Sequence, residues 1–584
     1  MQIYPAYFVG LGIIVYAIAY FVYARWYDKH IWEPDPKRTT PAHMYMDGIE
    51  FFPTSRSVLY GFQFKGIAGA APIVGPFVAL SFGWVPALLW ILFGNFFIGW
   101  LHDYGALFTS VRRDGKTLGP LTYELISPRA RNCLMGFLFF YLLTVAAAFM
   151  NVIATLFCLR GGAMIFIIFV VVAGVVSGAM LYKMKIPLWI TTIVGIIIMI
   201  VGVAVGSWAA PLPFWNLESL AEADKAYYLW MLVIISIICF LGAVLPIIWY
   251  AQPVNYMAFW PCIAGIILLV IGELASPIFG VTVKPDPFPE KWYFPAIGTG
   301  PIWPMLMVSI ACGAISGWHS LVGTSGSARQ LDVETDALPI GAGSMLTEGL
   351  LALSSLGAYM ALDAATAKTL GKVGGLAGGA CELLVPIFGE GAEPALWTFY
   401  VAFIALYAIT VLQLVIRFMR LALAEMTAPY PALGVIFSNK YVSAAICLLL
   451  GGAFAYSGAF INLWMLFGGS NQLMAGLALL LVTVHLANVK KPTKYNLGPA
   501  IFMIITCLSA LAYESFIMFS AAAGLFGLKP FAARSLALPG METVAKAFNI
   551  VFGSIGVILI ILGIIVVFDG YKALKRAWAT PAEQ

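Results

Sequence analysis

Lys65 is a basic residue inside an apolar run, residues 61–80, that is long enough to cross a lipid bilayer. A lysine at the centre of a membrane helix costs about 2.5–3.5 kcal/mol on insertion scales, and such charges usually mark an ion or substrate path. Burial disfavours the charged form of lysine, so Lys65 could bind and release a proton in place of a coupling cation. The alternative is a fixed ion pair with Asp103 or another buried acid, which would lock two helices together.

Four other titratable residues fall within apolar runs. His319 could pair with a substrate carboxylate or relay a proton, because imidazole titrates near neutral pH; it could also be a core histidine bonded to a carbonyl group. His102 and Asp103 fall near the cytoplasmic end of their run, where partial hydration favours a gate or an ion pair. Glu348 lies deeper, which suits either proton or cation binding or a hydrogen bond between packed helices.

Glycines and prolines interrupt the run 61–80, and lipid offers no partner for the backbone groups that they free. The free N–H groups at the start of a half-helix bind anionic groups well. We therefore expect a carboxylate-bearing substrate at such breaks, covered by Phe64 or Trp318. The residues expected around the substrate are Gly66, Ala68, Gly69, Gly323, Thr324 and Ser325.

Residues 64–71 resemble residues 318–325, because each stretch begins with an aromatic and a basic residue and continues with small and apolar residues around a glycine. An odd number of expected spans separates the two units, which therefore have opposite orientations in the membrane. This pattern is typical of inverted repeats, which hold substrate between discontinuous helices. Small residues that allow close helix packing would give a similar composition without a repeat.

The whole composition indicates an integral membrane protein, with 62% apolar and 10% charged residues and a mean hydropathy of +0.93. A hydropathy window indicates about fifteen spans, in a range of about 14 to 17, including 228–250 and 302–323. The Gly-rich stretch 369–389 could span, re-enter or lie at the surface. Most of the 32 Lys and Arg residues fall on one side, which places the N-terminus outside and the C-terminus in the cytoplasm.

Several classes of function are disfavoured by the motifs. No ATP-binding, dinucleotide-binding or HxxxH pattern is present, so we expect no enzyme, no catalytic residue, no metal and no cofactor. The eight cysteines are scattered and are expected to be small buried hydrophobic residues. No basic patch indicates nucleic acid. The expected partners are a small-molecule substrate and the bilayer, and the oligomeric state is open.

Motifs occur in order along most of the chain at residues 46–54, 67–76, 112–119, 311–320 and 466–475. They resemble the carbon starvation protein (CstA) family of bacterial inner-membrane transporters. The resemblance implies uptake of peptides or pyruvate, and kinship with the amino acid/polyamine/cation superfamily and its LeuT-like repeats. The chain departs from the family at Phe62-Gln63, where a His-His pair is common, and at Lys65, where a small residue is common.

We therefore expect an all-α polytopic membrane protein with LeuT-like inverted repeats. Residues 61–300 would hold the first repeat plus extra helices and 301–520 the second, with peripheral helices in 1–60 and 521–584. Such a protein would import a small carboxylate-bearing nutrient, such as pyruvate, a peptide or an amino acid, by alternating access. Proton coupling through Lys65 and His319 is the first hypothesis. Sodium coupling is the second, and a nutrient sensor or channel-like protein is the third.

Overall fold

The computed structural model describes residues 2–159, 161–209, 225–457, 460–531 and 542–580. These residues form helices and connecting loops, and their one β-type contact is an isolated bridge between Thr54 and Leu331. The helices are α1 (Pro5–Ile18), α2 (Arg25–Tyr27), α3 (Pro41–Met44), α4 (Arg56–Ile67), α5 (Ala71–Ala79), α6 (Trp84–Gly94), α7 (Trp100–Val111), α8 (Leu118–Leu125), α9 (Pro128–Leu159), α10 (Gly161–Gly178), α11 (Leu188–Ala209), α12 (Lys225–Val244), α13 (Ala251–Phe279), α14 (Ile302–Ser309), α15 (Gly317–Ser325), α16 (Ser344–Met360), α17 (Ala364–Phe388), α18 (Glu393–Thr427), α19 (Pro431–Ser438), α20 (Lys440–Ser457), α21 (Phe460–Asn488), α22 (Lys494–Ala523) and α23 (Glu542–Ala579).

Among the described residues, 11 helices are long and apolar enough to cross a membrane, and the number rises to 13 if each of two bent pairs is one span. The expected all-helical, multi-pass architecture is confirmed, whereas the expected number of about fifteen is not. Two ranges account for the difference between 13 and fifteen spans. The range 228–250 contains only the shorter apolar helix Tyr228–Val244, and 302–323 is divided between α14 and α15. Of the expected peripheral region 521–584, residues 532–541 and 581–584 lie outside the described residues.

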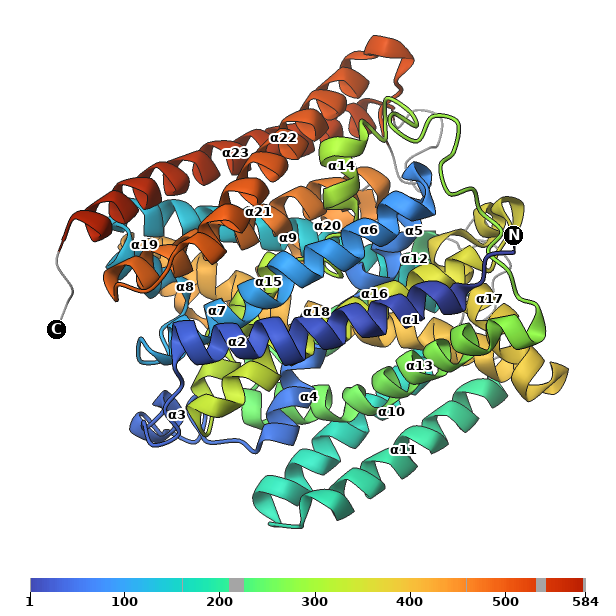
Figure 1. The fold of residues 1–584 in the computed structure, drawn as a ribbon, viewed down its shortest axis with the longest axis horizontal. Helices are drawn as coiled ribbons and strands as arrows, with labels where there is room; N and C mark the ends of the chain where they lie inside the picture. The colour runs from blue at the N-terminus through green and yellow to red at the C-terminus, as the bar shows by residue number, and fades with distance from the viewer. Residues whose placement is uncertain (1, 160, 210–224, 458–459, 532–541, 581–584) are drawn as a thin grey trace.

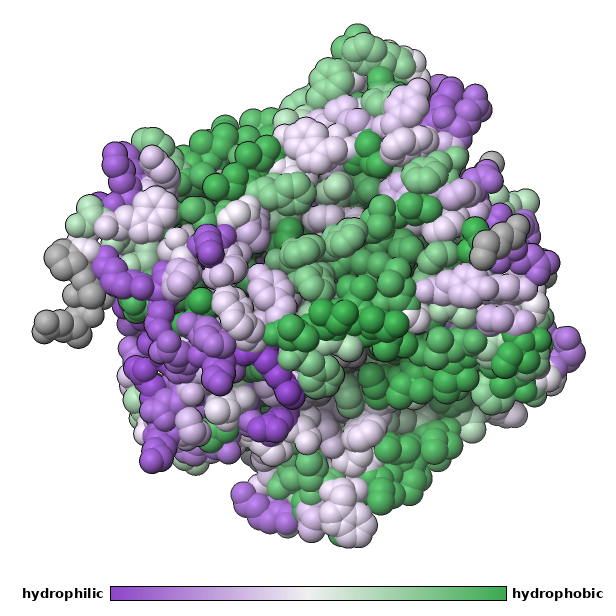
Figure 2. Space-filling model, viewed as in Figure 1, coloured by the Kyte–Doolittle hydropathy of each residue, from purple (hydrophilic) through white to green (hydrophobic). Residues whose placement is uncertain are grey.

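The centre of the molecule is formed by α9, α18 and α21, whose apolar stretches are almost entirely buried. By contrast, α1, α11 and α23 expose most of their apolar surface, as helices that face lipid do. Figure 2 shows a broad apolar zone across the middle of the molecule and hydrophilic residues gathered at the end that carries α2 and α3. In Figure 1, α1 begins near one end of the long axis and α23 finishes at the other.

The first broken span consists of α4 and α5, which are bent by 41° at the break. Ala68 leaves the helical conformation and ends α4, and Pro72 at the start of α5 has no N–H to continue the ladder. Gly75 lets α5 approach the second broken span closely, because a Cβ atom there would lie 2.9 Å from the carbonyl oxygen of Ser309. The interruption that the sequence indicated within 61–80 is therefore present.

The other bent pair consists of α19 and α20, which are bent by 87°. We use the name second broken span for α14 and α15, two short helices that do not qualify together as a membrane span, and for the non-helical segment between them, residues 310–316. Figure 1 shows that the two broken spans run in opposite directions along the molecule. Their breaks differ in one respect from the repeat alignment. Lys65 lies in the last turn before its break, whereas His319 lies in the first turn after its break. The two residues therefore do not occupy equivalent positions relative to the breaks.

Each broken span is followed by a helix that contains a π-helical turn. The turn Asn95–Gly99 joins α6 to α7, and the turn Pro339–Gly343 leads into α16. Such turns are frequent at functional sites because they shift the side chains that follow them. The ambiguous stretch 369–389 belongs to α17, where Gly371 has a φ of +65° and the apolar part Gly374–Phe388 is too short for a complete span.

Candidate functional site

The carboxylate of Asp103 lies between two histidines at the centre of the molecule. Its Oδ1 atom is 2.8 Å from Nδ1 of His102, and its Oδ2 atom is 2.8 Å from Nδ1 of His319. All three side chains are buried. Since His102 and Asp103 belong to α7 and His319 belongs to α15, the carboxylate joins the helix that follows the first broken span to the second broken span.

Glu348 of α16 extends this chain of titratable groups. Its Oε2 atom lies 3.1 Å from Nε2 of His319, on the side of the ring opposite Asp103. Glu348 is fully buried, and neither of its carboxylate oxygens has a hydrogen-bond partner of good geometry among the described residues. A buried carboxylate without full hydrogen bonding is costly unless it is paired or protonated. The arrangement can therefore hold a proton between Glu348, His319 and Asp103.

The start of α15 is held by Asn471 of α21. The Oδ1 atom of Asn471 accepts a hydrogen bond from the backbone N–H of Trp318 at 3.0 Å, and its Nδ2 atom donates to the carbonyl of Ala311 at 2.8 Å. Gly317 makes this contact possible, because a Cβ atom there would lie 2.3 Å from the carbonyl oxygen of Asn471. These bonds fix the orientation of His319 at the start of the half-helix.

Lys65 is fully buried at the end of α4. Its ammonium group donates to the carbonyl oxygen of Ala68 at 3.1 Å and lies 3.9 Å from the centre of the Tyr407 ring. Asp103 is paired with the two histidines, so the ion pair between Lys65 and Asp103 that the sequence allowed is not formed. A carbonyl and an aromatic face are weak partners for an ammonium group compared with a carboxylate. The described partners of Lys65 are therefore a carbonyl oxygen and an aromatic ring rather than a carboxylate.

Both aromatic residues predicted to cover the substrate lie near the end of α4, Phe64 within that helix and Trp318 against it from α15. The indole Nε1 of Trp318 donates to the carbonyl of Gly66 at 2.7 Å, which links the two broken spans directly. The ring of Phe64 packs edge-on against Phe259 and Tyr407. Trp318 therefore satisfies a backbone group at the break, and Phe64 packs between helices.

The predicted backbone cradle is only partly assembled. Ala68 and Gly69 lie at the break before α5, and the N–H of Ala68 bonds to the carbonyl of Phe64 rather than being free. Gly323, Thr324 and Ser325 instead lie in the last turn of α15, where the unpaired groups are carbonyls rather than N–H groups. The prediction that these three residues start a half-helix is wrong, because the unwound segment precedes Trp318 rather than following it.

The prediction that His102 and Asp103 are partly hydrated is also wrong. Both side chains are buried, and α7 continues to Val111, two turns beyond Asp103. The span is longer than the hydropathy pattern indicated, because polar residues late in the helix pack against protein rather than water.

Two residues of the site were not anticipated for their chemistry. Cys312 lies in the unwound segment, and its Sγ atom belongs to a compact group with His319 and Glu348. Tyr407 of α18 faces Lys65. No pattern in the sequence distinguishes either residue from other buried cysteines and tyrosines. Asn471 carried a signal, since an asparagine inside an apolar run must find a partner.

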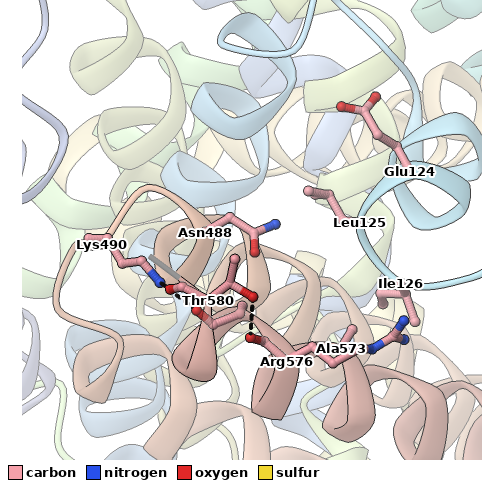
Figure 3. Close-up of a pocket in the computed structure, with 9 residues that line it drawn as sticks. Glu124, Leu125, Ile126, Asn488, Lys490, Ala573, Arg576 and Thr580 are labelled. Atoms are coloured by element: carbon pink, nitrogen blue, oxygen red, sulfur yellow. Dashed lines mark hydrogen bonds between the residues drawn. The ribbon is translucent and has the colours of Figure 1, made fainter. Parts of the chain in front are cut away.

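Figure 3 shows a cavity away from this cluster, between α8, the end of α21 and the end of α23. It has a volume of about 190 Å³, and Lys490 at its rim donates to the carbonyl of Ala577 at 2.6 Å. Its lining contains none of the predicted site residues. This cavity is formed by the capping of α23 rather than by the broken spans.

Buried titratable groups beside discontinuous helices are typical of membrane transporters. The sequence profile of the family described as "Carbon starvation protein CstA" matches residues 5–375 and 358–510. The chain belongs to this family, which confirms the resemblance noted in its motifs.

Three curated relatives illustrate the family. The peptide transporter CstA of Bacillus subtilis is 27% identical over 98% of this chain and 97% of that protein. The peptide transporter CstA of Escherichia coli is 28% identical over 87% of this chain and 81% of that protein. The pyruvate/proton symporter BtsT of Escherichia coli is 28% identical over 86% and 81%, respectively. The chain is therefore a multi-pass membrane transporter, and its relatives carry transporter rather than enzyme names.

Proposed function

We propose that this chain is a secondary active transporter that imports a small carboxylate-bearing nutrient, such as pyruvate, a short peptide or an amino acid, together with protons. The observation that carries the proposal is the buried chain His102–Asp103–His319–Glu348, which joins α7, α15 and α16. Buried ionisable residues that connect moving helices are typical of proton relays in transporters. The name of one relative, a pyruvate/proton symporter, supports the same coupling ion.

The proposed architecture is a LeuT-like pair of inverted repeats, with the first unit in residues 61–300 and the second in 301–520. Its support is the opposite direction of the two broken spans and the π-helical turn that follows each of them. Asp103 follows the first π turn and Glu348 follows the second. Movement of one unit against the other would open and close the site in alternating access.

Lys65 is proposed to act as a tethered cation at the first break. Its ammonium group contacts the Ala68 carbonyl, the kind of freed backbone oxygen that coordinates a coupling cation in other transporters. Protonated Lys65 would stabilise the break and provide positive charge for the substrate carboxylate. Loss of its proton would release both contacts during the cycle.

The proposed location is the bacterial inner membrane, with the N-terminus outside and the C-terminus in the cytoplasm. The excess of Lys and Arg on one side of the spans supports this orientation. The test is the reactivity of single cysteines near each end towards a membrane-impermeant reagent in intact cells. Labelling at the C-terminal end without lysis would contradict the proposal.

The test of transport uses purified protein in proteoliposomes with labelled pyruvate, alanine and dialanine. An imposed inward proton gradient should concentrate at least one of them, and a pH-sensitive dye inside should report acidification on substrate addition. Accumulation driven only by a sodium gradient would assign sodium coupling instead. Equilibration without accumulation under either gradient would assign a channel-like protein, and substrate binding without flux would assign a sensor.

Variants of the buried chain test its role. Glu348→Gln should remove proton-driven accumulation while substrate counterflow continues, because counterflow requires no net proton movement. Glu514→Gln is the matched control, since Glu514 of α22 is also buried and has no described hydrogen-bond partner. Equal loss of accumulation in both variants would show that any buried carboxylate matters only for folding.

A further inference from the structure

Cys312, His319 and Glu348 bring three different ligand types together in the core. The thiol sulfur, an imidazole nitrogen and a carboxylate oxygen lie within 4.8 Å of one another, and all three residues are buried. They come from the unwound segment, the start of α15 and α16. A cysteine, a histidine and a glutamate are the ligands that divalent ions of intermediate softness, such as Zn²⁺, take in proteins.

We propose that these three side chains form a binding site for a divalent transition-metal ion, with Zn²⁺ as the probe. The Nε2 atom of His319 and both carboxylate oxygens of Glu348 lack a hydrogen-bond partner of good geometry, although each is buried. Nε2 of His319 lies 3.1 Å from Oε2 of Glu348. Two ligands of a tetrahedral metal ion lie roughly 3.3 Å apart when the metal bonds are about 2.0–2.1 Å long. These two atoms of a buried pair therefore already have the spacing of adjacent metal ligands.

Asp103 contacts the ring nitrogen of His319 that faces away from Glu348, and this contact supports the assignment. It holds Nδ1 of His319 at 2.8 Å, which fixes the ring and leaves Nε2 to face Glu348. A carboxylate on the far nitrogen is the arrangement that orients histidines in metal sites and makes them stronger ligands. Asp103 would be a positioning residue in this site, not a ligand.

Cys312 is also positioned for the role. Its Sγ atom accepts a hydrogen bond from Nδ2 of Asn471 at 3.4 Å and donates one to Oγ of Ser316 at 3.2 Å. Metal binding would displace the thiol proton, because the thiolate is the form that binds metal. With three protein ligands, the fourth position is left for water or a small molecule.

The same atoms would hold a proton in the proposed transport cycle, so a bound metal ion would compete with it. Metal binding itself does not depend on the transport proposal and is measured on the purified protein. The two proposals can therefore fail separately.

The experiment loads chelator-treated full-length protein in detergent with Zn²⁺ and then with Co²⁺. One equivalent of metal should bind per chain, and Co²⁺ should give the near-ultraviolet charge-transfer band of a thiolate ligand. Cys312→Ser should remove that band and weaken binding more than about tenfold. Cys507→Ser, at another buried cysteine in α22, is the control and should keep both.

Zinc-edge X-ray absorption of the wild-type protein provides a test that needs no variant. It should show one sulfur ligand at about 2.3 Å and nitrogen or oxygen ligands at about 2.0–2.1 Å. No stoichiometric binding, a spectrum without sulfur, or a thiolate band that survives Cys312→Ser would overturn the proposal. Loss of transport with intact metal binding would instead count against the transport proposal alone.

Discussion

The two broken spans satisfy their free backbone groups in different ways. At the second break, donors come from a third helix, α21. Asn471 Nδ2 lies 2.8 Å from the Ala311 carbonyl oxygen, and Gln472 Nε2 lies 3.0 Å from that of Ile310. Trp464 adds a third donor from the same helix. The second break is therefore fixed to the core of the molecule.

At the first break, the described side-chain donors are Lys65, which bonds the Ala68 carbonyl, and Trp318, which bonds that of Gly66. One donor can lose a proton, and the other belongs to the second broken span. The difference indicates that the second break serves as a fixed scaffold, whereas the first depends on a titratable charge and on the position of its neighbour. Substitutions at the two breaks should consequently affect different properties.

The largest effect is expected from Lys65→Met, which keeps the length of the side chain and removes the charge. Proton-driven accumulation should fall on the order of 100-fold, because the charged hydrogen bond to the Ala68 carbonyl, worth about 1.5–3 kcal/mol, and the contact with the Tyr407 ring are lost. Counterflow should remain measurable, and the melting midpoint in detergent should change little. Unchanged accumulation would make Lys65 a structural residue and would remove the contrast between the breaks.

Asn471→Ala should act on stability rather than on coupling. The substitution leaves several buried groups of the second break without partners, so we expect a loss of about 2–4 kcal/mol in the free energy of unfolding. Thermal melting of the purified protein measures the effect. Asn132→Ala, at an exposed asparagine of α9, is the control and should melt like the wild type. A coupling defect in Asn471→Ala without a change in melting would reverse the roles assigned to the breaks.

Gly75→Ala tests the contact between the two broken spans. The added methyl group would lie 2.9 Å from the Ser309 carbonyl oxygen, which predicts a destabilisation of about 1–3 kcal/mol. Gly498→Ala, where the methyl group would meet no atom within 4 Å, should be neutral or slightly stabilising. Equal melting of the two variants would show that the close approach is not rigid.

The smallest effect is expected from Trp318→Phe, which keeps the ring and removes one hydrogen bond to the first break. The expected loss is about 1 kcal/mol, measured as a small decrease in the melting midpoint together with a similar decrease in accumulation. A loss as large as that of Lys65→Met would show that the indole, rather than the lysine, controls the first break.

Much of this contrast could be predicted from residue types, because backbone polar groups within a bilayer must be hydrogen-bonded inside the protein. Glycines and prolines in 61–80 indicated the first break, and a long apolar composition indicated the helices. The second break was placed incorrectly relative to Trp318, because residues 310–316 contain no proline and the donors of α21 that bond their free carbonyls are distant in sequence. The grouping of Asp103, His319 and Glu348 depends on helix packing over long separations, so composition could not predict it.

Cys312 is a clearer example of a residue whose role could not be predicted from the sequence. A single cysteine in an apolar run has no local pattern that separates a ligand from a packing residue. Only its distance to His319 and Glu348 gives it chemical significance. Lys65 is the opposite case, since its charge was conspicuous in the sequence while its actual partners, a carbonyl and the Tyr407 ring, were not.

The position of the Asp103 carboxylate has a consequence for the order of events in a working cycle. One oxygen is bonded to the histidine next to it in the chain and the other to a histidine of the second broken span. In the proposed transport cycle, separation of α7 from α15 would leave Asp103 with His102 and detach it from His319. Separation of the helices and loss of the hydrogen bond between Asp103 and Nδ1 of His319 would then be a single event. A kinetic isotope effect on the rate of the opening step would therefore report on the breaking of this hydrogen bond and on the helix movement together.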